Sequence, residues 1–227
     1  MILNTDWQAL RDCCRDDAAF VRLQKLLELD HGNGHTANQT SQQESIAQTD
    51  LLRGIVEAIS QLLTGSNYSE AIATALRILG EATSVDRVYI FDIHPHLETG
   101  EPATSQQFEW VRKSISPQIN NPRLQNRGLI SSGLGRWYGL LQQGRSFNAI
   151  VRELPPAEQA VLVVQDIQSV LIVPIQVGGE LRGFVGFDDC SRERRWSGAE
   201  EAALQIVAAS LGGRSPVSKA KPATERW

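Results

Sequence analysis

The spacing of apolar residues along this chain first predicts two amphipathic helices. Between residues 46 and 63, apolar residues recur at steps of three and four and so share one helical face; they are Leu52, Ile55, Val56, Ile59, Leu62 and Leu63. Residues 65–67 (Gly-Ser-Asn) end this helix. A second helix is predicted from about Ser69 to Ala82, with Ser69 as its N-terminal cap.

The spacing then changes to a strand pattern. Residues 87–93 (RVYIFDI) are apolar or aromatic on both faces, which is typical of a central strand. Residues 106–110 alternate, with Phe108 and Trp110 on one face, and predict a hairpin partner whose other face meets solvent. Residues 114–133 lack periodicity and predict a long irregular excursion, a feature that in compact domains tends to be functional or mobile.

Two short helices are predicted next, one over Leu134–Gln143 and one that begins at Pro155, since proline is tolerated in a first helical turn. The clearest element of the chain follows them. Residues 170–177 and 180–187 form the strands of a β-hairpin, and Gly178–Gly179 supplies the positive φ of its two-residue turn.

The residues of this hairpin predict how its strands pair and how closely neighbouring parts of the chain can approach it. With a two-residue turn, Val173 faces Phe184 across the strands. Pro174 has no N–H, so it must lie where no neighbouring strand needs one. Gly183 and Gly186 leave room for another part of the chain to pack closely.

A capped helix follows the hairpin. Ser197 and Glu200 have the spacing of a capping box, and Gly212–Gly213 is predicted to end the helix. Its buried stripe consists of Ala203, Ile206, Val207, Ser210 and Leu211. The order of all these elements predicts an α+β fold, with a central antiparallel sheet and helices packed on its faces.

The composition fits one ordinary domain with extra segments. The chain has 227 residues and a net charge of −4, which does not favour a nucleic-acid or anionic-membrane surface. Residues 1–30 predict a short helical segment, residues 31–44 a polar linker or the frayed start of the next helix, and residues 214–227 a disordered tail.

The number and spacing of the cysteines indicate in which cellular compartment the protein is expected. Cys13, Cys14 and Cys190 are odd in number and irregularly spaced, so they do not form the framework of a disulfide-rich secreted protein. No run approaches the ~20 apolar residues that span a bilayer. We therefore expect a reducing, cytoplasmic location.

Two polar sets could carry chemistry. Asp92, His94 and His96 alternate on an extended segment and could serve a divalent metal, but Pro95 favours a polar turn after the strand, and we predict no metal site. Asp188 and Asp189 are paired carboxylates that could act as acid and base. The neighbouring arginines favour a structural ion-pair cluster instead; they are Arg192, Arg194 and Arg195.

Several runs of this sequence resemble a known family. LIVPIQVGGELRGFVGFDDC and RRWSGAEEAALQIVAASLGG look like the end of a GAF domain, and RVYIFDIH and QFEWV look like its first two strands. The insertion ISPQINNPRLQN, followed by GLGRWYGLLQQGRSF, is similar to a subgroup found in bacterial sensor histidine kinases and related two-component signalling proteins. The resemblance covers about residues 48–213, and we take residues 45–213 as the domain. It implies a GAF/PAS-like fold whose terminal helices could form a dimer bundle.

The resemblance also implies a ligand pocket on one sheet face, beneath the insertion. Its wall would draw on aromatic residues whose alternative use is plain core packing: Tyr89, Phe91, Phe108, Trp110, Trp137, Tyr138 and Phe184. The NKFDE set of cyclic-nucleotide-binding relatives is not found. Bilin-binding relatives attach the pigment through a cysteine, often as Cys-His, whereas Cys190 precedes Ser191. A covalent bilin is therefore not expected, and the cofactor stays open.

We expect a stand-alone sensory or regulatory domain of bacterial signal transduction that is not an enzyme. It would bind a small ligand, or a partner such as a sensor kinase or response regulator, and signal as a homodimer through helices 46–63 and 197–211. Neither nucleic acid nor a membrane is expected as a partner. Two alternatives stay open. One is a thiol-dependent reductase of free methionine sulfoxide, which needs several thiols beside the pocket; the other is a purely structural dimerisation module.

Overall fold

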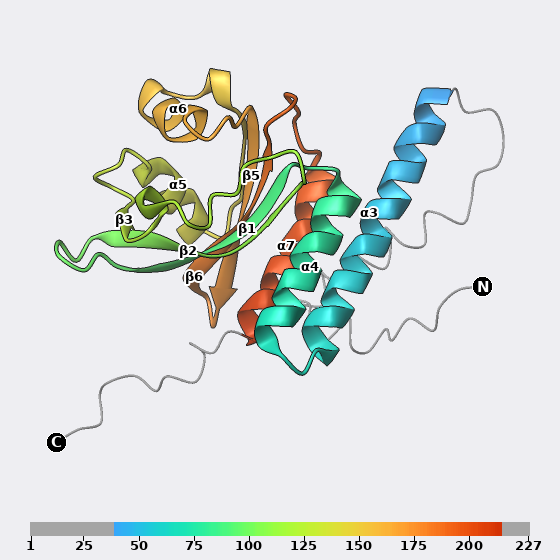
Figure 1. Cartoon of the computed structure of the whole chain (residues 1–227), viewed down its shortest axis with the longest axis horizontal. Helices are drawn as coiled ribbons and strands as arrows, with labels where there is room; N and C mark the ends of the chain where they lie inside the picture. The colour runs from blue at the N-terminus through green and yellow to red at the C-terminus, as the bar shows by residue number, and fades with distance from the viewer. Residues whose placement is uncertain (1–38, 215–227) are drawn as a thin grey trace.

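The computed structural model describes residues 39–214, which form an antiparallel sheet of six strands with helices on both faces (Figure 1). The strands lie in the order β3-β2-β1-β6-β5-β4. They are β1 (Arg87–Pro95), β2 (Pro102–Val111), β3 (Arg127–Gly128), β4 (Phe147–Ile150), β5 (Ser169–Val177) and β6 (Glu180–Asp189). This arrangement confirms the predicted α+β architecture and the central position of β1. The predicted segment 1–30, residues 31–38 of the predicted linker and residues 215–227 of the predicted tail lie outside the described residues, whereas Arg214, also assigned to the tail, belongs to the last helix.

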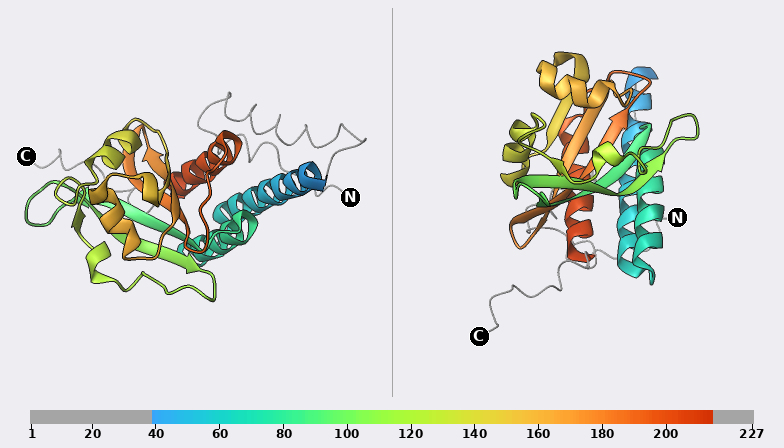
Figure 2. Two further views of the ribbon diagram at one scale, coloured as in Figure 1. Left: turned by 90° about the horizontal axis from the view of Figure 1, so that it is seen from above. Right: turned by 60° about the vertical axis from the view of Figure 1, so that its left-hand side comes forward.

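One face of the sheet is covered by a layer of three helices (Figures 1 and 2). These are α3 (Gln39–Thr64), α4 (Tyr68–Thr83) and α7 (Gly198–Arg214). The predicted stripes of α4 and α7 pack toward the sheet, and the α3 stripe packs on α4 and α7; Ile55, Leu76 and Leu79 are completely buried. Two members of the predicted α3 stripe are exceptions, since Val56 is partly buried and Leu63 is 42% exposed.

Two predicted boundaries of these helices need correction. Residues 39–44, predicted as part of a linker or of the start of the next helix, belong to α3, because this polar stretch contains neither glycine nor proline to stop a helix. The N-terminal cap of α4 is Asn67 rather than Ser69. The Asn67 side-chain oxygen accepts hydrogen bonds from the backbone N–H groups of Ser69 and Glu70, at 3.0 and 3.3 Å.

The other face of the sheet carries two short helices and irregular chain (Figure 2). The helices are α5 (Gly135–Gln142) and α6 (Pro156–Val163), both close to their predicted positions, and two 3-10 turns accompany them, η2 (Pro122–Leu124) and η3 (Val151–Glu153). Each face has its own hydrophobic core, so the sheet separates a helical core from a core beneath α5 and α6.

The β5–β6 hairpin forms as predicted, but with a different register. A bulge between Ile175 and Gln176 in the pairing shifts the strands by one residue, so Val173 faces Val185 rather than Phe184. Pro174 lies beyond Ile172, where the pairing of β4 with β5 ends. The missing N–H of Pro174 therefore interrupts no strand ladder, as the sequence predicted.

A second bulge sets the faces of β2. Ile90 pairs with Phe108 but Phe91 pairs with Gln106, so Gln107 is an extra residue in β2. The alternation along β2 is therefore reversed at Gln107. Phe108 turns toward the helical core, while Gln106 shares the opposite face with Phe91.

The start of α7 confirms the predicted capping box. Ser197 Oγ accepts from the Glu200 N–H at 3.2 Å, and the Glu200 carboxylate accepts from the Ser197 N–H at 2.7 Å. The predicted glycine stop is wrong, because α7 continues to Arg214. Gly212 instead allows a close approach to the sheet: a Cβ there would lie 2.8 Å from the Gln176 carbonyl oxygen. Within residues 39–214, none of the helices combines the length and apolarity needed to cross a bilayer.

Candidate ligand site

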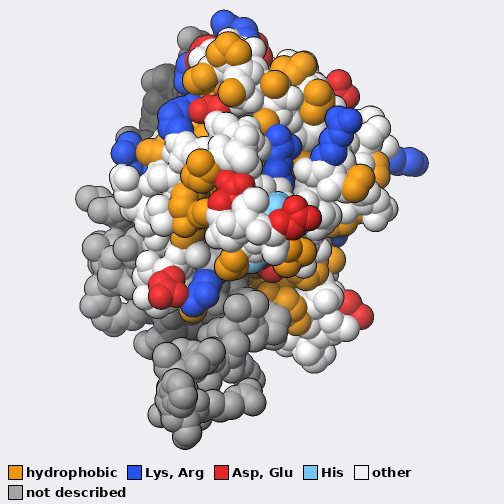
Figure 3. All heavy atoms as spheres, turned by 90° about the vertical axis from the view of Figure 1, so that its left-hand side faces the viewer, with side chains coloured by type: hydrophobic (Ala, Val, Ile, Leu, Met, Phe, Trp, Pro, Cys, Tyr) orange, Lys and Arg blue, Asp and Glu red, His pale blue; other side chains and the backbone are white. Residues whose placement is uncertain are grey.

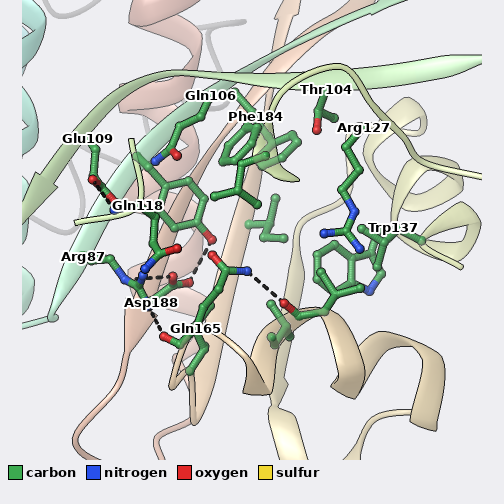
Figure 4. Close-up of a pocket in the computed structure, with 18 of the residues that line it drawn as sticks. Arg87, Thr104, Gln106, Glu109, Gln118, Arg127, Trp137, Gln165, Phe184 and Asp188 are labelled. Carbon is green, nitrogen blue, oxygen red and sulfur yellow. Dashed lines mark hydrogen bonds and ion pairs between the residues drawn. The ribbon is translucent and has the colours of Figure 1, made fainter. Parts of the chain in front are cut away.

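A cavity lies between the sheet and the segments that carry α5 and α6 (Figure 4). Its volume, measured as the space open to the centre of a water-sized sphere, is about 60 Å³. Apolar side chains make up most of its wall. Its polar lining residues are Arg87, Thr104, Gln106, Glu109, Gln118, Arg127, Gln165 and Asp188.

The floor of the cavity carries a buried ion pair that spans the two central strands. Arg87 of β1 and Asp188 of β6 are direct cross-strand partners, and each side chain is only 1% exposed. Arg87 Nε lies 3.6 Å from Asp188 Oδ2, and Tyr89 donates its hydroxyl to Asp188 Oδ1 at 2.8 Å. Arg87 also donates Nη2 to the Gln165 carbonyl oxygen at 2.5 Å and to Cys190 Sγ at 3.1 Å. The sheet register thus gathers these groups at one end of the cavity.

Burial has the largest effect on the pKa values of the titratable side chains around this ion pair. It raises the pKa of Asp188 to about 7, although Arg87 and Tyr89 both favour the charged carboxylate. Burial and the neighbouring Asp188 also raise the pKa of Tyr89 well above its usual value. Burial raises the pKa of the Cys190 thiol to about 11, against the effect of Arg87. Cys190 is therefore a protonated thiol at neutral pH and a poor nucleophile.

Four of the seven predicted wall residues line the cavity: Tyr89, Phe91, Trp137 and Phe184. Phe91 and Phe184 stack with their ring centres 5.1 Å apart and their planes 13° from parallel. Tyr89 meets Phe91 edge to face at 5.5 Å. A flat aromatic surface therefore covers the part of the sheet beneath the cavity.

The other three predicted wall residues lie elsewhere. Phe108 and Trp110 pack against the helical core, on the opposite face of the sheet, because the bulge at Gln107 reverses the alternation of β2. Gly80 of α4 leaves the space that the Trp110 ring occupies. Tyr138 packs at the edge of the core beneath α5 and does not line the cavity.

The cavity contains polar groups whose bonding capacity is unused. Gln106 is 5% exposed, and its Oε1 has no hydrogen-bond donor among residues 39–214. Arg127 of β3 is half-buried at the wall and forms no ion pair with any carboxylate of the described residues. Buried polar atoms are usually paired, so each of these groups calls for an explanation.

Glu158 holds the cover of the cavity together. This α6 carboxylate is 4% exposed and accepts hydrogen bonds from Arg136 Nε at 2.8 Å, Arg136 Nη2 at 2.6 Å and Trp137 Nε1 at 2.9 Å. Burial alone would raise the pKa of Glu158, but the bonds from Arg136 and Trp137 bring it below its ordinary value. Glu158 thereby joins α6 to α5 and fixes the Trp137 ring.

Removing this carboxylate should loosen the cover. We expect Glu158→Ala to lower the free energy of unfolding by about 1–3 kcal/mol at pH 7, because Trp137 Nε1 loses its acceptor in a buried place. Since folding lowers the pKa of Glu158, its contribution is present above the ordinary carboxyl pKa and is lost as the pH falls through the lowered value. Urea unfolding at pH 7 and pH 3 measures both effects. Glu153→Ala, which removes a more exposed partner of Arg195, is the matched control and should cost under about 1 kcal/mol.

The other polar sets of the sequence have structural partners. His94 Nε2 hydrogen-bonds Ser105 Oγ at 2.8 Å, and His96 Nδ1 accepts two backbone N–H groups of the β1–β2 turn. Within residues 39–214, no group of three His, Cys, Asp or Glu side chains is placed to hold a metal ion. Asp189 pairs with Arg192 at 3.4 Å and with Arg194 at 3.7 Å, which is part of the ion-pair cluster that the sequence favoured. The other two members of the predicted cluster have different partners: Asp188 pairs with Arg87, and Arg195 pairs with Glu153.

Sequence reasoning did not find the polar half of the site. Arg87 and Asp188 are paired only by the register of β1 and β6, and Gln106 enters the cavity only because of the bulge in β2. One signal was available: Arg87 opens a strand that is otherwise apolar on both faces, so its charge needed a buried partner. On the surface beside the cavity, acidic and basic side chains are interspersed with apolar ones (Figure 3).

Comparisons with known proteins agree on one family. A family model for the GAF domain matches residues 67–214. The methanogenesis regulatory histidine kinase FilI of Methanothrix harundinacea (strain 6Ac) is 41% identical over 170 residues, which are 75% of this chain and 19% of that protein. The chain thus spans about a fifth of the length of this curated relative.

Solved structures share the fold. The chromophore-binding domain of the bacteriophytochrome RpBphP3 from R. palustris superposes with a TM-score of 0.59 at 13% identity, covering 74% of this chain and 60% of that one. The biliverdin-bound, far-red absorbing dark state of JSC1_58120g3 superposes with a TM-score of 0.56 at 20% identity, covering 70% of this chain and 96% of that one. At these identities the likeness concerns the fold alone.

Proposed function

Because the chain belongs to the GAF domain family, we propose that it is a sensory module that binds a small ligand in the cavity beneath α5 and α6. The observation that carries this proposal is a cavity whose wall holds the unpartnered Gln106 Oε1 and the half-buried Arg127 guanidinium, which has no carboxylate partner among residues 39–214. A ligand that donates a hydrogen bond to Gln106 Oε1 would satisfy this buried oxygen, and an anionic ligand would pair with Arg127. Core packing alone gives no reason to keep them there.

The sheet connects the cavity to the helices through which we propose that the module signals. Strands β1, β5 and β6 face the cavity on one side and the layer of α3, α4 and α7 on the other. Gly212 of α7 lies directly against β5. We propose that α3 and α7 have two arrangements and that the ligand shifts the equilibrium between them. The size of this shift is set by the difference between the ligand's affinities for the two arrangements.

The wider signalling role is also a proposal. The similarity to a regulatory histidine kinase suggests that the module controls a sensor kinase or response regulator, as a homodimer joined by its terminal helices. The irregular cysteine pattern suggests a cytoplasmic setting. Each of these points needs its own measurement.

The cavity does not fit a bilin. The space in this cavity that is open to the centre of a water-sized sphere is about 60 Å³, which is small for a linear tetrapyrrole. Cys190, the cysteine that the described residues contain, is engaged by Arg87 at 3.1 Å. The same thiol, with its pKa of about 11, argues against a thiol-dependent reductase, and we propose a non-enzymatic role.

Filling the cavity should abolish ligand binding. Val161 of α6 lines the cavity and is 8% exposed, whereas Val163 on the same helix is 55% exposed. We expect native mass spectrometry of the protein purified from its source organism to show an added small mass on the wild type. Val161→Phe should lose this mass, and Val163→Phe, the matched control, should keep it. No added mass on any of the three proteins, or a mass that Val161→Phe retains, would contradict the proposal.

A further inference from the structure

The half-buried Arg127 is placed to receive an anion. It lies on β3, directly across from Thr104 of β2, and its guanidinium reaches the cavity beside the Trp137 ring (Figure 4). Burial lowers the pKa of this guanidinium, and the positive charge of Arg123 lowers it further. Within residues 39–214 no carboxylate forms an ion pair with Arg127. A guanidinium in such surroundings gains most from a carboxylate, which it can bind through two parallel N–H groups.

The acidic residues of the cavity do not compete for this charge. Glu109 accepts from the backbone N–H groups of Gln118, at 2.8 and 2.9 Å, and Ile119, at 2.9 Å. Asp188 is held by Arg87 and by the Tyr89 hydroxyl. An anion that enters the cavity therefore meets, at Arg127, a guanidinium that forms no ion pair within residues 39–214, while Glu109 and Asp188 already have partners.

A second group on the wall needs a hydrogen-bond donor. Gln106 is more than nine-tenths buried, and its Oε1 is unpartnered among the described residues. Figure 4 shows Gln106 and Arg127 on different sides of Phe184, so one ligand lying over this ring could reach both. The donor and the acid of the ligand would then sit at opposite ends of its body.

The size and shape of the cavity restrict that body. The space open to the centre of a water-sized sphere is only about 60 Å³. The stacked rings of Phe91 and Phe184, together with Trp137, border it. Aromatic rings pack best against flat apolar or aromatic groups, so a single small ring suits this space.

We infer that the cavity selects a small, flat monocarboxylate, an aromatic acid of one ring, with its carboxylate on Arg127 and a hydroxyl or amine donor on Gln106 Oε1. This inference rests on the proposed function, because it names the class of ligand that the cavity holds. Binding at this site neutralises Arg127 and satisfies the orphaned amide oxygen together. It also gives a reason for a buried amide oxygen without a donor and a half-buried arginine without a carboxylate partner on the same cavity wall.

The test uses 4-hydroxybenzoate as the probe and its neutral isostere 4-hydroxybenzamide as the comparison, both measured by isothermal titration calorimetry at pH 7.5. We expect the acid to bind at least about tenfold more tightly than the amide. Arg127→Gln should weaken binding of the acid by about 10- to 100-fold, as expected for loss of a charged hydrogen-bond partner, and leave binding of the amide unchanged. Arg127→Lys should give an intermediate loss, because it keeps the charge but not the paired N–H groups.

The matched control is Arg123→Gln, which removes the same charge from an exposed neighbour outside the cavity. It should change binding of the acid less than threefold. Gln106→Leu should remove the advantage of 4-hydroxybenzoate over benzoate, since the acceptor for the hydroxyl is gone. Circular dichroism establishes that each variant is folded.

Several results would overturn the inference. They are equal binding of acid and amide, full binding of the acid by Arg127→Gln, or no binding of either acid at 10 mM. The proposed function is tested separately by the mass that Val161→Phe should lose. If that mass is lost in Val161→Phe but retained in Arg127→Gln, the cavity binds a ligand of another class, and only the present inference fails.

Discussion

We expect the Arg87→Met variant to unfold with a free energy about 3–5 kcal/mol below that of the wild type at pH 8, because the substitution breaks a buried ion pair from one side. Arg87 and Asp188 are each 1% exposed, so water cannot replace the lost partner. The variant leaves the Asp188 carboxylate buried with the Tyr89 hydroxyl, and it leaves the Gln165 carbonyl oxygen without the Arg87 donor. Urea unfolding followed by tryptophan fluorescence measures the loss.

The loss should depend on pH in a defined direction. Folding raises the pKa of Asp188 to about 7, mainly through burial. A carboxyl raised in this way stabilises the fold fully below its unfolded pKa of about 4 and loses that contribution as the pH rises through the folded value. Without Arg87 the folded pKa rises further, so Asp188 stays neutral over a wider range. The difference between the variant and the wild type should therefore be smaller at pH 5 than at pH 8.

Two comparisons isolate the buried charge. Arg182→Met removes an arginine from an exposed pair with Glu180, also on β6, and should cost under about 1 kcal/mol. The double variant Arg87→Met/Asp188→Asn should recover much of the loss, because no unpaired charge then remains inside. A cost below 1 kcal/mol at pH 8, or an equal cost at both pH values, would show that Asp188 does not depend on Arg87.

The helices and strands with a periodic sequence were predictable, because the residues on the buried face of each one recur at a fixed spacing. The stripes of α3, α4 and α7 and the β5–β6 hairpin follow from local spacing. The capping box at Ser197 is equally local, since its two hydrogen bonds join residues three apart. The strand β4 went unpredicted because its four residues, Phe147–Ile150, are too few to show alternation.

The site was harder to predict than the fold, because it depends on pairing between distant strands. The aromatic residues Tyr89, Phe91 and Phe184 were found because they lie on strands whose identity was clear. One inserted residue, Gln107, moved Phe108 to the other face of the sheet. The hydrophobic pattern of a short strand does not reveal a bulge. The resulting one-residue shift of register, which exchanges the residues on the two faces of the strand, therefore cannot be predicted from that pattern.

The glycines on β6 are a case in which sequence and structure agree. Adding a side chain at one of them should have the second large effect on the stability of the fold. Gly183 was predicted to make room for a close neighbour, and that neighbour is the backbone of β1: a Cβ on Gly183 would overlap the Phe91 carbonyl oxygen. Gly183 pairs with Asp92 in the register of the two central strands. A backbone atom cannot turn aside as a side chain can, so Gly183→Ala must push β1 and β6 apart.

We expect Gly183→Ala to lower the free energy of unfolding by about 3 kcal/mol, at the upper end of the usual cost of overpacking. Gly139→Ala is the matched control. Gly139 lies inside α5, and a Cβ there would meet nothing within 4 Å. The same added methyl group should therefore stabilise the protein by about 0.5–1 kcal/mol through its helix propensity. Urea unfolding of the two variants should give shifts of opposite sign. A Gly183→Ala variant as stable as the wild type would mean that β1 and β6 can separate at little cost. In that case the close contact of these strands could not be what holds Arg87 and Asp188 in register beneath the cavity.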